Sequence, residues 1–159
     1  MKPKILVITP ADHIHGLMSA LSEIGEVTYM PHPTNEQVID AVRGHDAIFT
    51  NPNKSNVHLG PDVIDAGTRL RVISTASTGT AHIDKRHAER RGITVLALTE
   101  ERTLINRISS TAEHAFALTL AAIRHIPQSF DSVRGGQWDY TEFIGRQLDH
   151  LTVGIVGFG

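Results

Sequence analysis

Short apolar runs alternate along the first part of the chain with segments whose apolar side chains recur at helical spacing. The run at residues 4–8 is rich in β-branched side chains and is closed by a Thr-Pro pair, which predicts a strand buried on both faces. Comparable runs at residues 26–30, 46–50, 69–74 and 93–98 predict further strands. The chain is therefore expected to alternate between strands and helices.

The segments between these runs carry the start and stop signals of helices. Residues 12–24 place apolar side chains at helical spacing before a glycine, and Thr34 with Gln37 forms a capping box ahead of a second apolar face. Further helices are predicted from Pro61, which suits a first helical position, and over residues 82–91. Strands that alternate with helices are typical of right-handed βαβ units. The predicted fold class is therefore α/β, with a flavodoxin-like, doubly wound parallel sheet.

The pattern changes in the last third of the chain. Residues 109–134 read as one long helix that Pro127 kinks. Residues 153–156 predict a new parallel strand, which runs into a Gly-x-Gly turn at Gly157 and Gly159. Such a turn is the first half of a dinucleotide-binding fingerprint. A tight turn that only closes a strand is an equally good interpretation of the two glycines.

Composition narrows the classes of function. A chain of 159 residues with 40% hydrophobic residues suits one domain of ordinary size with a buried core. Its 15 Lys and Arg against 17 Asp and Glu give a charge of -2 without blocks of like charge, so nucleic acid is not an expected partner. The apolar run near the N-terminus is too short for a signal peptide or a membrane span, which favours a cytoplasmic protein. The absence of cysteine excludes thiolate chemistry, and the 10 histidines lack ligand spacing, so no metal site is expected.

Several segments taken together resemble the D-isomer-specific 2-hydroxyacid dehydrogenases, the phosphoglycerate dehydrogenase-like branch included. The segments are STASTGTAHID at 74–84, RRGITV at 90–95, STAEH at 110–114, IRHIP at 123–127, GQWD at 136–139 and GIVGFG at 154–159. The resemblance implies a flavodoxin-like substrate domain at 1–100, a crossover helix and linker at 101–150, and the start of a truncated Rossmann domain at 151–159.

The resemblance also implies where a substrate binds. Ser77, Thr78 and Gly79 match the turn whose backbone N–H groups hold the substrate carboxylate in the family. Small residues after a strand end let consecutive amides converge on an anion. Apart from the resemblance, the loop at residues 51–54 follows the strand predicted at 46–50 at the same end of the sheet, where its Asn amides or the Lys54 ammonium can contact substrate oxygen atoms. Lys54 is the preferred candidate of these. A plain βα turn and an exposed loop lysine are the alternatives.

For the cofactor, the resemblance implies NAD or NADP. Thr111 matches the family position that approaches the nicotinamide end, although a capping box at this helix start needs no ligand. Gly157 and Gly159 match the opening of the family's Rossmann domain. Many relatives carry Asn where this chain has Arg107, so that contact is not transferred. A homodimer is implied for the full-length protein.

The function implied is an NAD(P)-dependent oxidoreductase that interconverts a D-2-hydroxyacid and its 2-oxoacid by hydride transfer. The family's catalytic histidine, its partner carboxylate and the substrate-binding arginine match no residue here, so this chain alone is not expected to transfer hydride. A non-catalytic remnant that binds small carboxylates or a partner protein is the alternative. The receiver domain of a response regulator has the same predicted sheet, but it needs an Asp at the end of its third strand to accept phosphate and a Lys at the end of its fifth. This chain has Thr50 or Asn51 and Leu98 or Thr99 at those places, which argues against a receiver.

Overall fold

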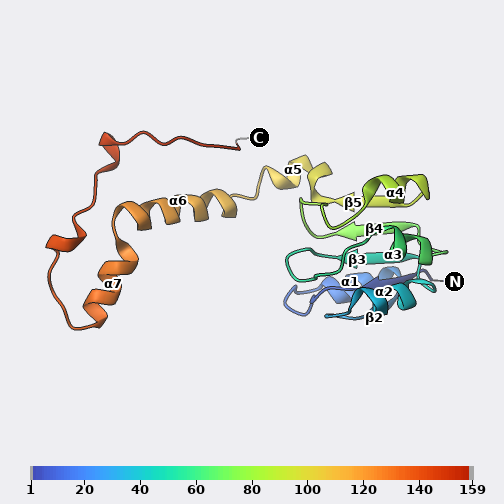
Figure 1. Cartoon of the computed structure of the whole chain (residues 1–159). Coiled ribbons are helices and arrows are strands. Elements are labelled where there is room, and N and C mark those ends of the chain that lie inside the picture. Colours follow the sequence, from blue (N-terminus) through green and yellow to red (C-terminus); the bar gives the residue numbers. More distant parts are fainter. Residues whose placement is uncertain (1, 158–159) are drawn as a thin grey trace. The chain divides into compact units, whose positions relative to one another are not determined.

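The computed structural model describes residues 2–157, and these contain one sheet of five parallel strands (Figure 1). The strands are β1 (Lys4–Val7), β2 (Glu26–Tyr29), β3 (Ala47–Thr50), β4 (Val72–Thr75) and β5 (Thr94–Ala97). They lie in the order β2-β1-β3-β4-β5, and each neighbouring pair is parallel. This order is flavodoxin-like and confirms the predicted fold class.

Helices cover both faces of the sheet. The helices are α1 (Leu17–Ile24), α2 (Asn35–Val42), α3 (Pro61–Ala66) and α4 (Lys85–Arg90). One face packs on α2, α3 and α4 through a buried cluster that includes Val38, Ile64 and Ala88. The other face packs on α1, whose Leu17 and Met18 lie against a second cluster. Strand β1 is buried on both faces, which explains why residues 4–8 read as a continuous apolar run, whereas β2 and β5 alternate between exposed and half-buried residues.

Two of these helices begin later than their apolar pattern predicts. Helix α1 begins at Leu17, because Gly16 before it has a left-handed backbone with φ of 79°. Helix α4 begins at Lys85, because Ile83 forms a parallel bridge with Leu59 and is held in an extended segment. The side chain of Asp84 then accepts a hydrogen bond from the helix backbone.

The capping box predicted for α2 is present. Thr34 Oγ1 accepts from the backbone N–H of Gln37 at 3.3 Å, and the Gln37 side-chain oxygen accepts from the backbone N–H of Thr34 at 2.9 Å. Helix α3 starts with Pro61 in its first turn, as predicted, and its C-terminal cap is Gly67. In α2 and α3, the local signals therefore mark where the helices start.

The chain divides into two compact units, residues 1–106 and residues 107–159. The first unit contains the sheet and ends with a short helix, α5 (Arg102–Ile105), which the sequence pattern does not predict. The second contains α6 (Ser110–Ile123) and α7 (Ile126–Arg134). Among the helices of residues 2–157, none combines the length and the hydropathy that crossing a bilayer requires.

The prediction of one long helix at 109–134 is wrong. Helix α6 ends at Ile123, and α7 starts at Ile126 after His125, which has a left-handed backbone with φ of 52°. Pro127 causes the break, since proline has no N–H to donate and its ring would clash with the carbonyl of Ile123. Pro127 instead occupies the first turn of α7, where the missing N–H costs nothing.

The strand predicted at 153–156 is also absent from the described part of the chain. Val153, Ile155 and Val156 are largely exposed, and no strand is formed there. A strand requires a neighbouring strand to accept and donate its backbone hydrogen bonds, and residues 2–157 offer none at this segment. Gly159 lies outside the described residues.

Candidate anion-binding site

The loops that contain the predicted substrate residues leave the sheet at the same edge. Strands β3 and β4 are adjacent and parallel, and Thr50 at the end of β3 is paired with Thr75 at the end of β4. The backbone N–H of Ala76 donates to the carbonyl of Thr50 at 3.0 Å, which continues the pairing one residue past the end of β4. The structure therefore brings together the starts of the loop with Lys54 and the loop 76–80. Ligands of open α/β sheets commonly bind at this carboxyl edge.

Loop 76–80 presents free backbone donors. The N–H groups of Ser77, Thr78 and Gly79 donate no hydrogen bond to any group within residues 2–157. Thr78 and Gly79 are exposed, and Ser77 is half-buried. Unpaired amides are costly only where water cannot reach them, so an exposed set of this kind is available to bind an anion.

Gly79 is not required by the backbone of the loop. Its φ lies outside the left-handed region, and a Cβ built on it meets no atom within 4 Å. A side chain at Gly79 would occupy that open space without disturbing the fold.

The shape of loop 76–80 is set by two hydroxyl groups, of which sequence reasoning identified only one. Thr75 Oγ1 lies 3.0 Å from Ser77 Oγ, and Ser77 Oγ donates to the carbonyl of Gly79 at 2.7 Å. The carbonyl of Ser77 accepts from the backbone N–H of Leu98 at 3.1 Å. The pattern of the sequence marks Thr75 only as the end of a strand, so its contact with Ser77 becomes visible in three dimensions alone.

The loop with Lys54 is held by Asn51. The carbonyl of Asn51 accepts from the backbone N–H groups of Lys54 at 3.2 Å and Ser55 at 3.1 Å, and its side-chain oxygen accepts from Asn53 N–H at 3.0 Å. Asparagine commonly stabilises turns in this way. Lys54 is exposed, and its ammonium group forms no ion pair with a described residue. The Asn51 side chain therefore stabilises the turn, while the Lys54 ammonium is available to bind a ligand.

His82 lies two residues after loop 76–80, and its surroundings become visible only in the structure. Both ring nitrogens are buried without a hydrogen-bond partner among residues 2–157. Burial lowers the pKa of His82 below its ordinary value, because it disfavours the charged imidazolium, and the nearby His58 lowers it further. His82 is therefore neutral near pH 7 and adds no positive charge to the site.

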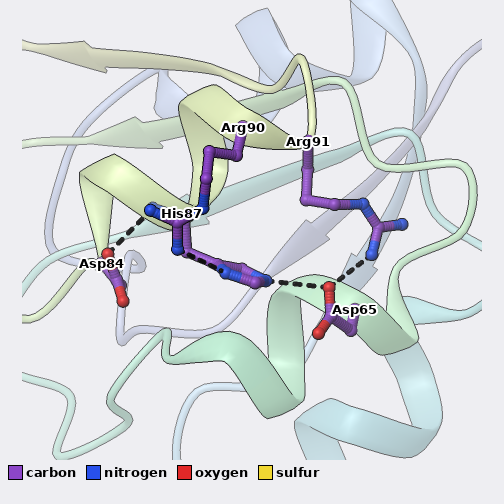
Figure 2. Close-up of polar contacts among 5 residues, drawn as sticks. All are labelled: Asp65, Asp84, His87, Arg90 and Arg91. Carbon is purple, nitrogen blue, oxygen red and sulfur yellow. Dashed lines mark hydrogen bonds and ion pairs between the residues drawn. The ribbon is translucent and has the colours of Figure 1, made fainter.

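His87, on α4, contacts two acidic residues. Its Nε2 lies 2.8 Å from Asp65 Oδ1, and its backbone N–H donates to Asp84 at 2.9 Å; both contacts are drawn as dashed lines in Figure 2. Arg91 also pairs with Asp65. The hydrogen bond from His87 is the main reason why the pKa of Asp65 is lowered. This cluster links α3 to α4, and no group of three or more potential metal ligands occurs within residues 2–157.

The predicted cofactor residues lie in the second unit. Thr111 is exposed in the first turn of α6. Gly157 is exposed and has φ of 83°, a conformation that favours glycine, and a Cβ there would meet no atom within 4 Å. The capping box expected at the start of α6 is not formed. The Ser109 hydroxyl donates to the Glu113 carboxylate and accepts no backbone N–H.

Models of one protein family match the chain. The model of the D-isomer specific 2-hydroxyacid dehydrogenase catalytic domain matches residues 5–134, and the model of the NAD binding domain of the same family matches residues 116–159. These ranges include every residue predicted to contact substrate or cofactor.

Individual relatives are similar over most of the chain. The D-3-phosphoglycerate dehydrogenase of Synechocystis sp. is 32% identical over 156 residues, which cover 98% of this chain and 26% of the relative. The glyoxylate reductase of Pyrococcus furiosus is 33% identical over 169 residues, which cover 100% of this chain and 47% of the relative. The chain thus spans between about a quarter and a half of the length of these curated relatives.

A solved structure shows the same fold. The D-lactate dehydrogenase of Aquifex aeolicus, complexed with NAD and lactic acid, superimposes with a TM-score of 0.71 at 20% identity. The superposition covers 93% of this chain and 42% of that structure. At this level of identity the similarity concerns the fold.

Proposed function

Because this chain belongs to the D-isomer specific 2-hydroxyacid dehydrogenase family, we propose that it supplies the substrate-binding part of an NAD(P)-dependent oxidoreductase. The reaction is the interconversion of a D-2-hydroxyacid and its 2-oxoacid by hydride transfer. The observation that carries this proposal is the set of free N–H groups at Ser77, Thr78 and Gly79, beside the loop that contains Lys54.

The chemistry of these groups suits a carboxylate. Consecutive backbone N–H groups at a strand end can donate to both oxygens of an anion, and such bonds are stronger than those between neutral groups. The ammonium of Lys54 adds a positive charge at the same edge of the sheet. Neutral donors with one nearby lysine favour a small monoanion, such as a 2-oxoacid, over a highly charged ligand.

The second unit is proposed to hold NAD or NADP in part. The open, left-handed Gly157 fits a glycine of a phosphate-binding turn, where a side chain would block the approach of the cofactor. Gly159 would be the second glycine of this turn, and Thr111 would face the nicotinamide end. When bound, the cofactor supplies the hydride chemistry. We assign no acid–base residue within the 159 residues, so we expect no turnover from this chain by itself.

A module that binds small carboxylates without catalysis is the second candidate. It is favoured by one observation: the proposed substrate residues all lie within residues 1–106, whereas the proposed cofactor residues all lie within residues 107–159. Binding of the carboxylate therefore does not require the cofactor residues to be complete.

The test is a titration of the ¹⁵N-labelled 159-residue chain with glyoxylate, followed by amide chemical shifts. We expect saturable shifts concentrated at Ser77, Thr78, Gly79 and the residues around Lys54, and no such shifts with the neutral amide of glyoxylate. Shifts spread over the surface, or equal responses to both compounds, would refute the carboxylate site.

The enzyme and the binding module are then separated by activity. The native polypeptide should be purified, its mass measured, and its oxidation of NADH and NADPH followed with glyoxylate and with other 2-oxoacids. A polypeptide about twice as long that oxidises the reduced cofactor supports the enzyme. Carboxylate binding without cofactor binding in the native polypeptide supports the module.

A further inference from the structure

A chain of hydrogen bonds, here called the hydroxyl relay, runs from the end of β4 into loop 76–80. The hydroxyl oxygens of Thr75 and Ser77 are 3.0 Å apart, and Ser77 Oγ lies 2.7 Å from the carbonyl oxygen of Gly79. A carbonyl oxygen can only accept, and a serine hydroxyl has one proton to donate. Ser77 therefore donates to Gly79 and must accept from Thr75, so the relay has a single direction.

The second bond of the relay encloses two peptide groups. The bond joins the side chain of Ser77 to the carbonyl of the residue two positions later, so the closed ring contains the Ser77–Thr78 and Thr78–Gly79 peptide groups. These peptide groups carry the N–H groups of Thr78 and Gly79, which donate to no described residue. Because a peptide group is planar, holding the ring restricts the direction of both N–H bonds.

Thr75 is a rigid anchor for this ring. It is 3% exposed and is the last residue of β4, which pairs with β3 on one side and with β5 on the other. Its direct neighbour in register is Thr50, which is equally buried but whose hydroxyl has no partner among residues 2–157. The sheet edge therefore offers two comparable threonines, of which only Thr75 is connected to the loop.

We propose that Thr75 is a positioning residue, whose hydroxyl acts through Ser77 to orient the Thr78 and Gly79 N–H groups toward the substrate carboxylate. Donors that are held in place before the ligand arrives bind it without the cost of ordering the loop. The orientation toward a carboxylate rests on the proposed function, whereas the ordering of the loop does not. Two measurements therefore address the two parts separately.

The first measurement is the order of the loop in the 159-residue chain, from ¹⁵N relaxation. Thr75→Val removes the hydroxyl at nearly constant shape, Ser77→Ala removes the middle of the relay, and Thr50→Val is the matched control. We expect the order parameters of Thr78 and Gly79 to fall below about 0.6 in Thr75→Val and Ser77→Ala, the flexible range. Thr50→Val and Thr75→Ser should remain near the parent. The Thr75→Val, Ser77→Ala double variant should be no more flexible than either single variant, because both break one relay.

The second measurement is the Kd for glyoxylate by amide shifts. Thr75→Val should raise it about fivefold, which corresponds to about 1 kcal/mol. Thr75→Ser should restore the parent value, and Thr50→Val should leave it unchanged. Thermal unfolding of each variant shows that the fold is retained.

The outcomes distinguish the ordering of the loop by the hydroxyl relay from the role of Thr75 in binding the carboxylate. Unchanged loop order in a folded Thr75→Val overturns the relay, whether or not glyoxylate binds. A more flexible loop with an unchanged Kd overturns the positioning role. If the parent chain does not bind glyoxylate at all, the proposed function and the positioning role fail together, and loop order alone decides whether the relay holds the loop.

Discussion

Replacing Gly79 with valine separates binding from folding at the proposed carboxylate site. A Cβ at Gly79 meets no atom within 4 Å, and the φ of Gly79 is outside the left-handed region, so the fold loses little. The branched side chain would instead occupy open space next to the Gly79 N–H, where an anion held by the loop amides would approach. Loss of one hydrogen bond to a charged ligand costs about 1.5–3 kcal/mol, which is roughly a 10- to 150-fold increase in Kd.

The assay is the glyoxylate titration of the 159-residue chain, with thermal unfolding measured in parallel. Gly44→Val is the matched control, because a Cβ at Gly44 also meets no atom within 4 Å and Gly44 lies after α2, outside loop 76–80. We expect Gly44→Val to bind as the parent does. A well-folded Gly79→Val with the Kd of the parent would refute the assignment of these amides to the carboxylate.

Three further predictions concern charge and buried polarity. Thr50→Val should raise the thermal midpoint by a few degrees, because it removes a fully buried hydroxyl without a partner in the described chain, and a lower midpoint would contradict this. Lys54→Met should weaken glyoxylate binding at low salt, and the difference from the parent should shrink as salt screens the charge; a salt-independent difference would exclude an electrostatic role. Asp65→Asn should destabilise the chain near pH 7, because the pKa of Asp65 is lowered in the folded state by the hydrogen bond from His87. That stabilisation is present above the unfolded-state pKa of about 3.9 and is lost as the pH falls through the folded-state pKa, so the difference in stability between Asp65→Asn and the parent should be full at pH 7 and should shrink as the pH is lowered below about 3.9.

The fold follows from local patterns where those patterns and the tertiary contacts agree. The β-branched run at residues 4–8 predicts β1 because that strand is buried on both faces, and Thr34 predicts the start of α2 because a capping box is made within four residues. The sequence pattern fails where a contact with a residue far along the chain sets the end of a helix or strand. Helix α4 starts late because Leu59 holds Ile83, and no periodicity in residues 82–91 reports that bridge.

The candidate site is likewise predictable only in part from the sequence. The strand followed by Ser77, Thr78 and Gly79 predicts a turn with accessible amides, and the structure leaves those amides free of partners among residues 2–157. What orients them depends on Thr75, whose hydroxyl meets Ser77 only after the chain has turned. The predicted strand at 153–156 failed for a related reason, since its apolar pattern is local but its hydrogen-bond partners are not.

The segment that carries the loop amides is tied to the sheet region at both of its ends. Ala76 N–H donates to the carbonyl of Thr50, and Ile83 is bridged to Leu59, which also accepts from the N–H of Asp84 at 3.0 Å. Both ties use backbone atoms, so they do not depend on which side chains stand between them. For protein engineering, residues 78–81 are therefore a natural cassette: a segment of equal length from another member of the family can be exchanged as one block while Ser77 and the half-buried His82 are kept, so that ligand preference is redesigned without repacking the core.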